Sequence, residues 1–235
     1  MEVDVLAQTP NAERLVCQTA RGDYHDGYVG DTAFEKLMEP VEGETIDDKM
    51  ETLITHLFKR GHWGPLEHPN ITIAVEGVSR SCMAQITRHR LASFDVQSMR
   101  YVDFGDKEAI VPASLKDTEH VARETGVVDL DEDELRELRN QYNRLTGMAI
   151  TQYQNLVEAG VPKEDARFVL PIGMPVNLSF TMNGRAILHL LDMRWKADAQ
   201  WEVRELAERV FEHYREWMPI TAELYEEKRP FALTP

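Results

Sequence analysis

The chain has 235 residues, of which 43% are hydrophobic, and a formal net charge of −15 at pH 7. This composition is typical of a folded globular protein, and no linker divides it, so we expect one domain over residues 1–235. The excess of Asp and Glu disfavours nucleic-acid binding over most of the surface. No apolar run of membrane-spanning length and no signal peptide occurs, so we expect a cytoplasmic protein that does not bind a membrane.

The first half of the chain predicts both strands and helices. The N-terminal stretch MEVDVLA alternates valine with acids, which is typical of a half-buried strand. Residues 20–44 are rich in glycine and predict loops. Residues 45–61 predict a helix that Thr45 can cap and Gly61 can end. A loop over 62–69, a strand over 70–76, a helix over about 78–92 and a polar, irregular section to about residue 128 follow.

The second half predicts mainly helices. Asp131 can cap a long helix that extends to about Gly160. A short helix over 162–171, a strand over 175–183 and two helices over 184–194 and 198–218 follow. The mixture predicts an α+β (or α/β) fold. We expect antiparallel pairing, because no regular crossovers separate the early strands.

Several kinds of site find no support in the sequence. Cys17 and Cys82 are far apart and predict small buried thiols rather than a disulfide or a zinc site. The stretch GHWGPLEH holds His62, Glu67 and His68, but this spacing is not a known metal pattern, so we expect no metal. Glycine-rich nucleotide motifs and a serine-hydrolase elbow are also absent from the sequence.

A cluster of cations stands out on this acidic chain, in the stretch RHRLASFDVQSMRY over residues 88–101. It fits an anion site, a nucleic-acid patch or the solvated C-terminus of a helix. Arg88 and Arg90 would point about 200° apart on a regular helix, so they serve two ligands or lie where the helix ends. His89 between them is expected to resist protonation. Arg167 lies beside apolar residues and is expected to be partly buried against an anion.

The same stretch resembles the signature of the flavin-dependent thymidylate synthases (the ThyX family), in which R-H-R is followed after seven residues by S. Arg88, His89, Arg90 and Ser98 fit that signature. GHWGPLEH, EDARFVLP and NGRAILHLLDMR with AQWEVR resemble further elements of the family, and all occur in the family's order between about residues 45 and 205. We therefore identify the chain as resembling this family over most of its length.

The resemblance implies a ThyX-type fold, an antiparallel sheet with flanking helices, and a homotetramer whose active sites are shared between subunits. It also implies an enzyme that converts dUMP to dTMP. FAD is the implied cofactor, and NADPH and the folate 5,10-methylenetetrahydrofolate are the implied co-substrates. No cysteine nucleophile is required, so neither cysteine of this chain needs a chemical role.

The resemblance also assigns residues. Arg194 is expected to lie near the uracil ring and to act as the catalytic residue, because a guanidinium there stabilises negative charge that develops on the ring. Tyr101 is expected to close the dUMP loop. Flavin binding is assigned to His62, Gly64, Glu67, Arg88, His89, Arg90, Val96, Asn183, Gly184, Arg185 and His189. Substrate binding is assigned to Gln85, Ile86, Thr87, Arg88, Val96, Gln97, Ser98, Met99, Arg100, Arg167 and Arg194.

The chain departs from the family's pattern at a few positions. Asp95 and Val96 stand where the family often has Asn and Glu, and Gly64 stands where Thr is common. The side chain of Val96 cannot form a hydrogen bond. This departure leaves an alternative open, an FAD-binding NADPH oxidoreductase that has lost thymidylate synthesis. A nucleic-acid-binding module is the other alternative, and the acidity of the chain argues against it.

Overall fold

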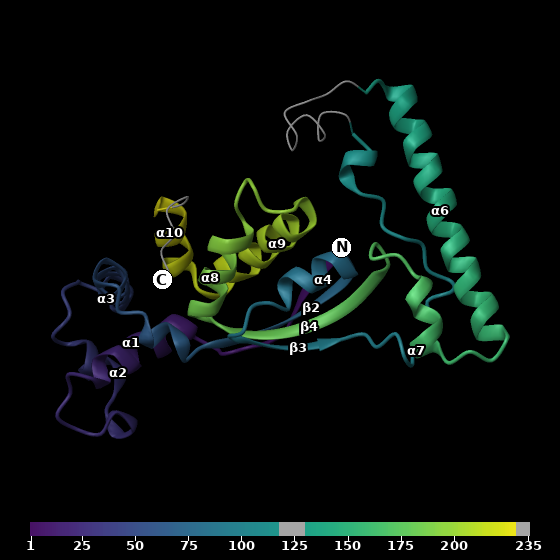
Figure 1. The fold of residues 1–235 in the computed structure, drawn as a ribbon. Helices are drawn as coiled ribbons and strands as arrows, with labels where there is room; N and C mark the ends of the chain where they lie inside the picture. Colours follow the sequence, from purple (N-terminus) through teal and green to yellow (C-terminus); the bar gives the residue numbers. More distant parts are fainter. Residues whose placement is uncertain (118–129, 229–235) are drawn as a thin grey trace. The chain divides into compact units, whose positions relative to one another are not determined.

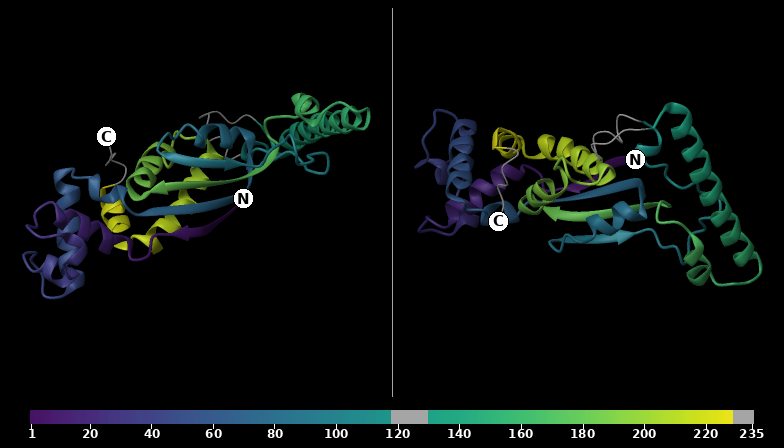
Figure 2. Two further views of the ribbon diagram at one scale, coloured as in Figure 1. Left: turned by 90° about the horizontal axis from the view of Figure 1, so that it is seen from below. Right: turned by 45° about the horizontal axis from the view of Figure 1, so that its top comes forward.

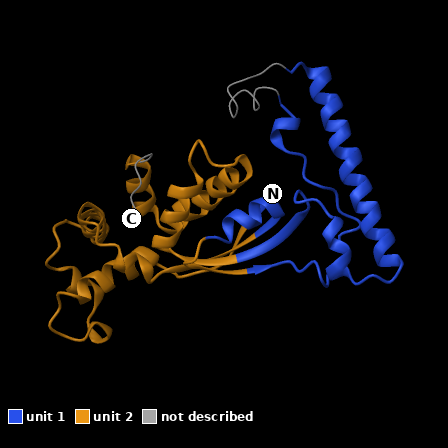
Figure 3. Cartoon of the chain, in the orientation of Figure 1, with its two compact units in different colours: residues 1–2, 75–88, 95–179 blue, residues 3–74, 89–94, 180–235 orange. Residues whose placement is uncertain are grey.

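The computed structural model describes residues 1–117 and 130–228. Its internal contacts divide the chain into two compact units (Figure 3). Unit 1 holds residues 1–2, 75–88 and 95–179, and unit 2 holds residues 3–74, 89–94 and 180–235. The chain passes from one unit to the other within each of the four strands and also between residues 88 and 89, so neither unit is one continuous stretch. The expectation of one domain over residues 1–235 stays a prediction.

The strands form one four-stranded sheet in the order β1-β2-β4-β3 (Figure 1). The hydroxyls of Thr72 and Thr181 lie 2.9 Å apart, and the Gly77 N–H donates to the side-chain oxygen of Asn177. Residue numbers therefore rise along β2 while they fall along β4, which is antiparallel pairing. The strands are β1 (Glu2–Gln8), β2 (Asn70–Ser79), β3 (Ala92–Val96) and β4 (Pro175–Asn183). The predicted α+β fold with an antiparallel sheet is confirmed.

Strand β4 continues into helix α8 (Gly184–Arg194) with no residue between them. Alternate residues of the strand are buried, and its last residue, Asn183, caps the helix by accepting a hydrogen bond from the Ala186 N–H. The buried strand residues are Val176, Leu178, Phe180 and Met182. The strand predicted over 175–183 and the helix predicted over 184–194 are both confirmed.

In unit 2, α9 packs against α8 and α10, and α1 packs against α2 and α3 (Figure 2). These helices are α1 (Ala12–Gly22), α2 (Phe34–Met38), α3 (Ile46–Arg60), α9 (Trp201–Trp217) and α10 (Pro219–Lys228). Thr45 and Asp48 form the capping box of α3, and Gly61 ends it in the left-handed conformation, as predicted. Helix α2 was not predicted, because the glycines around it favoured loops.

In unit 1, the long helix α6 (Glu132–Glu158) is capped by Asp131, as predicted. It packs against α7 (Lys163–Ala166) and the short 3-10 helix η4 (Arg167–Val169), which replace the helix predicted over 162–171. Helix α4 (Arg80–Ile86) is shorter than the prediction of 78–92, and β3 falls where an irregular section was predicted. Residues 118–128 of that section lie outside the described residues.

Two further findings bear on the class of protein. Cys17 and Cys82 are both buried free thiols, as the sequence predicted. Within residues 1–117 and 130–228, none of the helices has the length and apolar character that crossing a membrane requires.

Candidate functional site

The residues predicted to bind the dUMP phosphate lie in a tight turn of unit 1, directly after β3. The Gln97 N–H donates to the carbonyl of Asn177, which ties the start of the turn to β4. The Tyr101 N–H donates to the Ser98 carbonyl, and the Arg100 N–H lies 3.3 Å from the Ser98 hydroxyl, which accepts its hydrogen bond. The turn therefore gathers a hydroxyl, backbone N–H groups and a guanidinium within a few residues.

Helix α7 and η4 bring a second predicted arginine to this turn. The Arg100 Nε donates to the Glu164 carboxylate at 2.6 Å, and the Arg167 Nε donates to the Glu164 backbone carbonyl at 3.0 Å. Lys163 donates to the Tyr101 carbonyl at 3.4 Å. Both arginines predicted to hold the phosphate thus contact the same residue, Arg100 through its carboxylate and Arg167 through its backbone carbonyl, while Lys163 lies 3.8 Å from the Asp103 carboxylate. Guanidinium groups gathered in this way suit an anion.

A third arginine joins this cluster that the sequence reasoning missed. Arg80 is the first residue of α4, and its Nη1 donates to the sulfur of Met99 at 3.1 Å. Burial, and then the charge of Arg167, lower the pKa of Arg80, so the two guanidinium groups lie close enough to repel each other. An anion would relieve that repulsion. Arg80 lies between two serines in the stretch VSRSC, so the apolar neighbours that pointed to Arg167 are missing here and the sequence offered no comparable signal.

The remaining predicted dUMP residues have mixed environments. Ile86 is fully buried and Met99 is 4% exposed, so both side chains belong to the core and only their backbone groups can face a ligand. Thr87 donates its hydroxyl to the Met83 carbonyl at the end of α4. Gln85 and Val96 are half-buried, and Arg88 is exposed in the turn that follows α4.

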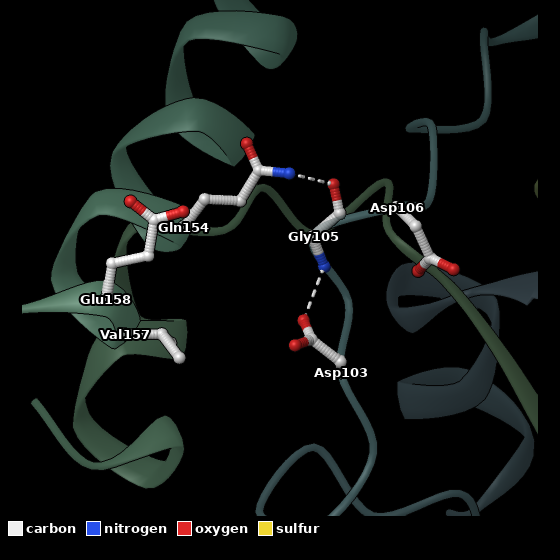
Figure 4. Close-up of a pocket in the computed structure, with 6 residues that line it drawn as sticks. All are labelled: Asp103, Gly105, Asp106, Gln154, Val157 and Glu158. Atoms are coloured by element: carbon white, nitrogen blue, oxygen red, sulfur yellow. Dashed lines mark hydrogen bonds between the residues drawn. The ribbon is translucent and has the colours of Figure 1, made fainter. Parts of the chain in front are cut away.

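An open pocket of about 370 Å³ lies elsewhere in unit 1 (Figure 4). Gln154 donates to the Gly105 carbonyl at 2.7 Å, and the Gly105 N–H donates to Asp103 at 2.9 Å. The pocket is lined by Asp103, Gly105, Asp106, Gln154, Val157 and Glu158. Its three carboxylates disfavour an anionic ligand, and none of the predicted site residues lines it. Among the described residues, no cluster of His, Cys, Asp and Glu could hold a metal ion.

Unit 2 brings together several residues predicted to bind flavin, where the 3-10 helix η2 (Gly64–Glu67) meets the start of α8. Arg185 donates to the Glu67 carboxylate, and the Gly184 N–H donates to the Pro69 carbonyl at 3.1 Å. A Cβ atom at Gly184 would lie 3.1 Å from the Leu66 carbonyl oxygen, so the close approach of the two segments favours glycine here.

Other flavin positions in this region are more exposed. The His62 Nε2 lies 3.5 Å from the Asp23 carboxylate, so this loop contacts the segment after α1. A Cβ at Gly64 would meet no atom within 4 Å. The backbone at this glycine is therefore open to a ligand, and the missing threonine side chain leaves unfilled space.

Two further residues of α8, His189 and Arg194, contact His89, the middle residue of the R-H-R triplet. The chain leaves the helical conformation after α4, and Arg88 and Arg90 are exposed in the turn. The arginines thus lie where the helix ends, which was one of the two predicted arrangements. His89 is only 8% exposed, and its Nε2 accepts a hydrogen bond from the Arg194 Nε at 3.0 Å. The rings of His89 and His189 meet edge to face, with centroids 5.9 Å apart.

His89 resists protonation, as the sequence predicted, but for a different reason. Burial comes first, and the charges of Arg194 and His189 follow, in lowering its pKa to about 4 from the ordinary 6.5. The neighbours in sequence, Arg88 and Arg90, are not the cause. At neutral pH the ring is therefore uncharged, and its Nε2 lone pair is the acceptor for Arg194.

Comparison with known proteins gives independent evidence on the family of this chain. A family model described as "Thymidylate synthase complementing protein" matches residues 4–220. The flavin-dependent thymidylate synthase of Halobacterium salinarum is 48% identical, covering 96% of this chain and 95% of that protein. The enzyme of the same name from Haloarcula marismortui is 46% identical, covering 97% of this chain and 96% of that protein.

A solved structure shares the fold. The UMP/dUMP methylase PolB of Streptomyces cacaoi, in a crystal structure bound with 5-Br dUMP, superimposes with a TM-score of 0.79. The match covers 99% of this chain and 96% of that chain, at 24% sequence identity. At this identity the likeness concerns the fold.

Proposed function

The chain belongs to the flavin-dependent thymidylate synthase family, and from this premise we propose that it methylates dUMP to dTMP. In this proposal 5,10-methylenetetrahydrofolate donates the methylene group and NADPH-reduced FAD donates the hydride. The observation that carries the proposal is the gathering of Arg80, Arg100 and Arg167 around the turn at Ser98, on a chain whose net charge is −15.

The turn in unit 1 is proposed to hold the dUMP phosphate. A phosphate monoester carries up to two negative charges, and planar guanidinium groups bind it with paired hydrogen bonds. The Ser98 hydroxyl and neighbouring N–H groups add donors. The Glu164 carboxylate, which pairs with Arg100 at 2.6 Å, then shares that guanidinium with the phosphate or gives it up. Gln85 to Arg88 and Val96 to Arg100 keep their proposed roles in dUMP binding.

Arg194 is proposed to act on the pyrimidine ring. Carbon 5 of uracil is a poor nucleophile, and a fixed guanidinium near the ring stabilises the negative charge that develops as carbon 5 attacks. Burial raises the pKa of the Cys17 thiol to about 12, and Cys82 is fully buried. The Cys17 thiol therefore supplies no thiolate at neutral pH, and both thiols are buried, which fits a reaction without a cysteine nucleophile.

The residues of unit 2 fit FAD. A diphosphate group needs cationic and N–H donors and close access to the backbone. Arg185 in the first turn of α8, His62 and the open backbone at Gly64 meet that need. We propose that they hold FAD with Glu67, His89, Arg90, Asn183, Gly184 and His189 of the same unit; the resemblance also assigns FAD binding to Arg88 and Val96, which belong to unit 1. When bound, reduced flavin supplies the hydride, which is chemistry of the cofactor rather than of the side chains.

A shared active site is part of the same proposal. We infer a cytoplasmic homotetramer in which each site draws residues from more than one copy. The exposed positions of Arg88, Arg90 and Arg100 fit this arrangement, because a second copy can cover them. A size measurement in solution tests it.

A second candidate function rests on one feature. Val96 offers no hydrogen-bonding side chain where the family often has Glu, so an FAD-binding NADPH oxidoreductase without thymidylate synthesis is the alternative. The deciding experiment incubates the purified protein with dUMP, 5,10-methylenetetrahydrofolate, NADPH and FAD, and measures dTMP. We expect dTMP and a yellow protein. NADPH oxidation without dTMP would favour the alternative, and a colourless protein that takes up no FAD would contradict both.

A further inference from the structure

We propose that Lys107 is a positioning residue for dUMP binding, which turns the side-chain amide of Gln97 so that the amide presents its N–H donors to the nucleotide phosphate. The inference rests on the proposed function, because it takes the turn after β3 as the phosphate site. The sequence gave Lys107 no role, and its assignment comes from contacts that only the folded chain makes.

The contact between the two side chains determines which end of the amide is free. The Lys107 Nζ donates to the Gln97 Oε1 at 3.1 Å. A lysine ammonium has three donors and no acceptor, so only the oxygen end of an amide can face it. The NH2 end of Gln97 is left without an acceptor within residues 1–117 and 130–228. The turn therefore holds a pair of unused donors beside Ser98.

Lys107 is itself held in place. Its Nζ lies 4.6 Å from the centre of the ring of Phe104, which is fully buried. The Gly105 carbonyl ties this segment to helix α6 (Figure 4), and the Ile110 N–H donates to the Gly173 carbonyl at 2.9 Å. The lysine thus extends from a segment that is anchored on both sides of it.

The backbone of Gln97 is fixed as well. Its N–H donates to the Asn177 carbonyl at 2.8 Å, and the Asn177 side-chain oxygen accepts from the Gly77 N–H at 3.1 Å. Strand β4 therefore holds the main chain of Gln97 while Lys107 holds its side-chain oxygen. Donors that already lie in place lose little conformational freedom when a ligand arrives.

The charge of Lys107 strengthens these donors. In the described part of the chain, no carboxylate lies within ion-pair distance of Lys107, whereas Arg100 pairs with Glu164. A half-buried lysine bonded to a neutral amide is unusual on a chain of net charge −15. Its positive charge polarises the amide, and the N–H groups at the other end become better donors to an anion.

This assignment also bears on Val96, whose side chain cannot form a hydrogen bond where the family often has Glu. Gln97 follows Val96 directly in the sequence. With its amide fixed as a donor, Gln97 offers the turn a polar side chain that Val96 does not. The pair of Lys107 and Gln97 therefore supports dUMP binding despite this departure from the family's pattern.

The test measures the Kd for dUMP by calorimetry on the FAD-loaded protein, without NADPH or folate. We expect Lys107→Met, which can still contact Phe104 but cannot donate, to raise the Kd about 3- to 10-fold. Lys107→Arg keeps a donor and should retain the affinity. Gln97→Glu should raise the Kd about 10-fold or more, because a carboxylate offers no donor and repels phosphate. Lys59→Met, an exposed lysine on α3, is the control and should match the unmodified protein.

Two comparisons separate positioning from a general structural role. In a Gln97→Met background, Lys107→Met should raise the Kd far less than it does alone, because the lysine acts through the amide. Deoxyuridine, which lacks the phosphate, should bind Lys107→Met as it binds the unmodified protein. In steady state the KM for dUMP should rise in Lys107→Met while kcat stays the same. Melting temperatures identify any variant that has lost its fold.

The outcomes distinguish the inference from its premise. An unchanged Kd in folded Lys107→Met, full multiplication of the two effects in the double variant, or equal weakening of deoxyuridine would overturn the inference alone. If the unmodified protein binds dUMP but forms no dTMP, the proposed reaction is wrong and the Kd values still decide the role of Lys107. If it binds no dUMP, both fall.

Discussion

The arginines of unit 1 and the arginine at the end of α8 in unit 2 are held in opposite ways. Arg100 lies in a turn, its side chain is 54% exposed, and its partner Glu164 is charged and 45% exposed. Arg194 lies on a capped helix, is half-buried, and its partner His89 is buried and neutral. An exposed ion pair is weak and screened by salt, whereas a buried hydrogen bond fixes direction.

The difference matches two chemical tasks. A phosphate is a large, symmetric charge that several cations can share, so an adaptable cluster serves it and no single position is decisive. Charge that develops on one face of a pyrimidine must meet a donor that already lies in place. The two regions should therefore respond differently to the same substitution of arginine by alanine.

The largest effect is expected for Arg194→Ala. Loss of a fixed donor to a developing negative charge should lower kcat by about 10²- to 10³-fold, while flavin content changes little. Steady-state dTMP formation and visible absorbance measure the two quantities. Arg209→Ala, on the exposed surface of α9 beside Glu205, is the matched control and should be silent. A variant that loses flavin but keeps its turnover would contradict the role given to Arg194.

Arginines of the cluster in unit 1 should affect substrate binding instead. We expect Arg80→Ala and Arg100→Ala each to raise the KM for dUMP about tenfold and to leave kcat nearly unchanged, because each removes one charged hydrogen bond. The penalty for Arg100→Ala should shrink as salt rises, since this side chain is exposed. Arg136→Ala, beside Asp133 on α6, is the control. If Arg80→Ala and Arg100→Ala lowered kcat as much as Arg194→Ala does, the proposed difference between substrate binding in unit 1 and catalysis by Arg194 would be wrong.

A smaller effect is expected where η2 meets α8. Gly184 and Gly64 can be compared directly there, because a side chain would meet close neighbours at Gly184 and none at Gly64. Gly184→Ala places a Cβ 3.0 Å from the Met218 sulfur and 3.1 Å from the Leu66 carbonyl oxygen. We expect it to lower the free energy of unfolding by about 1–3 kcal/mol. Gly64→Ala meets no atom within 4 Å and should have little effect. Urea unfolding of both variants measures the difference, and equal stabilities would show that the two segments can separate without cost.

The smallest expected effect concerns pH. The pKa of His89 is about 4 in the folded protein and 6.5 in a free histidine, so the unfolded chain binds the proton first as the pH falls. Stability from this group is therefore complete above pH 6.5 and is lost as the pH falls toward 4. Between pH 7 and pH 5 the loss should reach up to about 2 kcal/mol. Between pH 7 and pH 5, the free energy of unfolding should fall less in His89→Gln than in the unmodified protein. Equal decreases in the two proteins would contradict the lowered pKa of His89.

The elements that the sequence predicted well carry their own local signals. Strand β4 alternates buried and half-buried residues and ends at a capping asparagine, and α3 and α6 begin with capping boxes. Helix α1 lacks such a signal. It begins after Asn11, whose φ of 49° is left-handed and whose side chain makes no capping hydrogen bond. Strand β3 has only five residues and is held by tertiary pairing, as the bond from Gln97 to Asn177 shows.

The candidate site likewise contains residues that local sequence patterns could assign and contacts that only the folded chain shows. Motif residues such as Ser98 and Arg185 could be assigned by resemblance, because their spacing is local. The bond between His89 and Arg194 depends on two segments that meet only in the folded chain, and no local pattern reports such a meeting. Arg80 lies between two serines, so its sequence neighbours did not point to it, and the charge of Arg167 beside it is a product of the fold.

The direct passage from β4 to α8 also limits how this chain can change its length. Asn183 is both the last residue of the strand and the cap of the helix. One inserted residue would turn α8 by about 100° relative to its cap, and would carry Arg185, His189 and Arg194 away from their partners together. The spacing between strand and helix is thus as much a part of the site as the side chains themselves, and we expect natural insertions and deletions to avoid this junction.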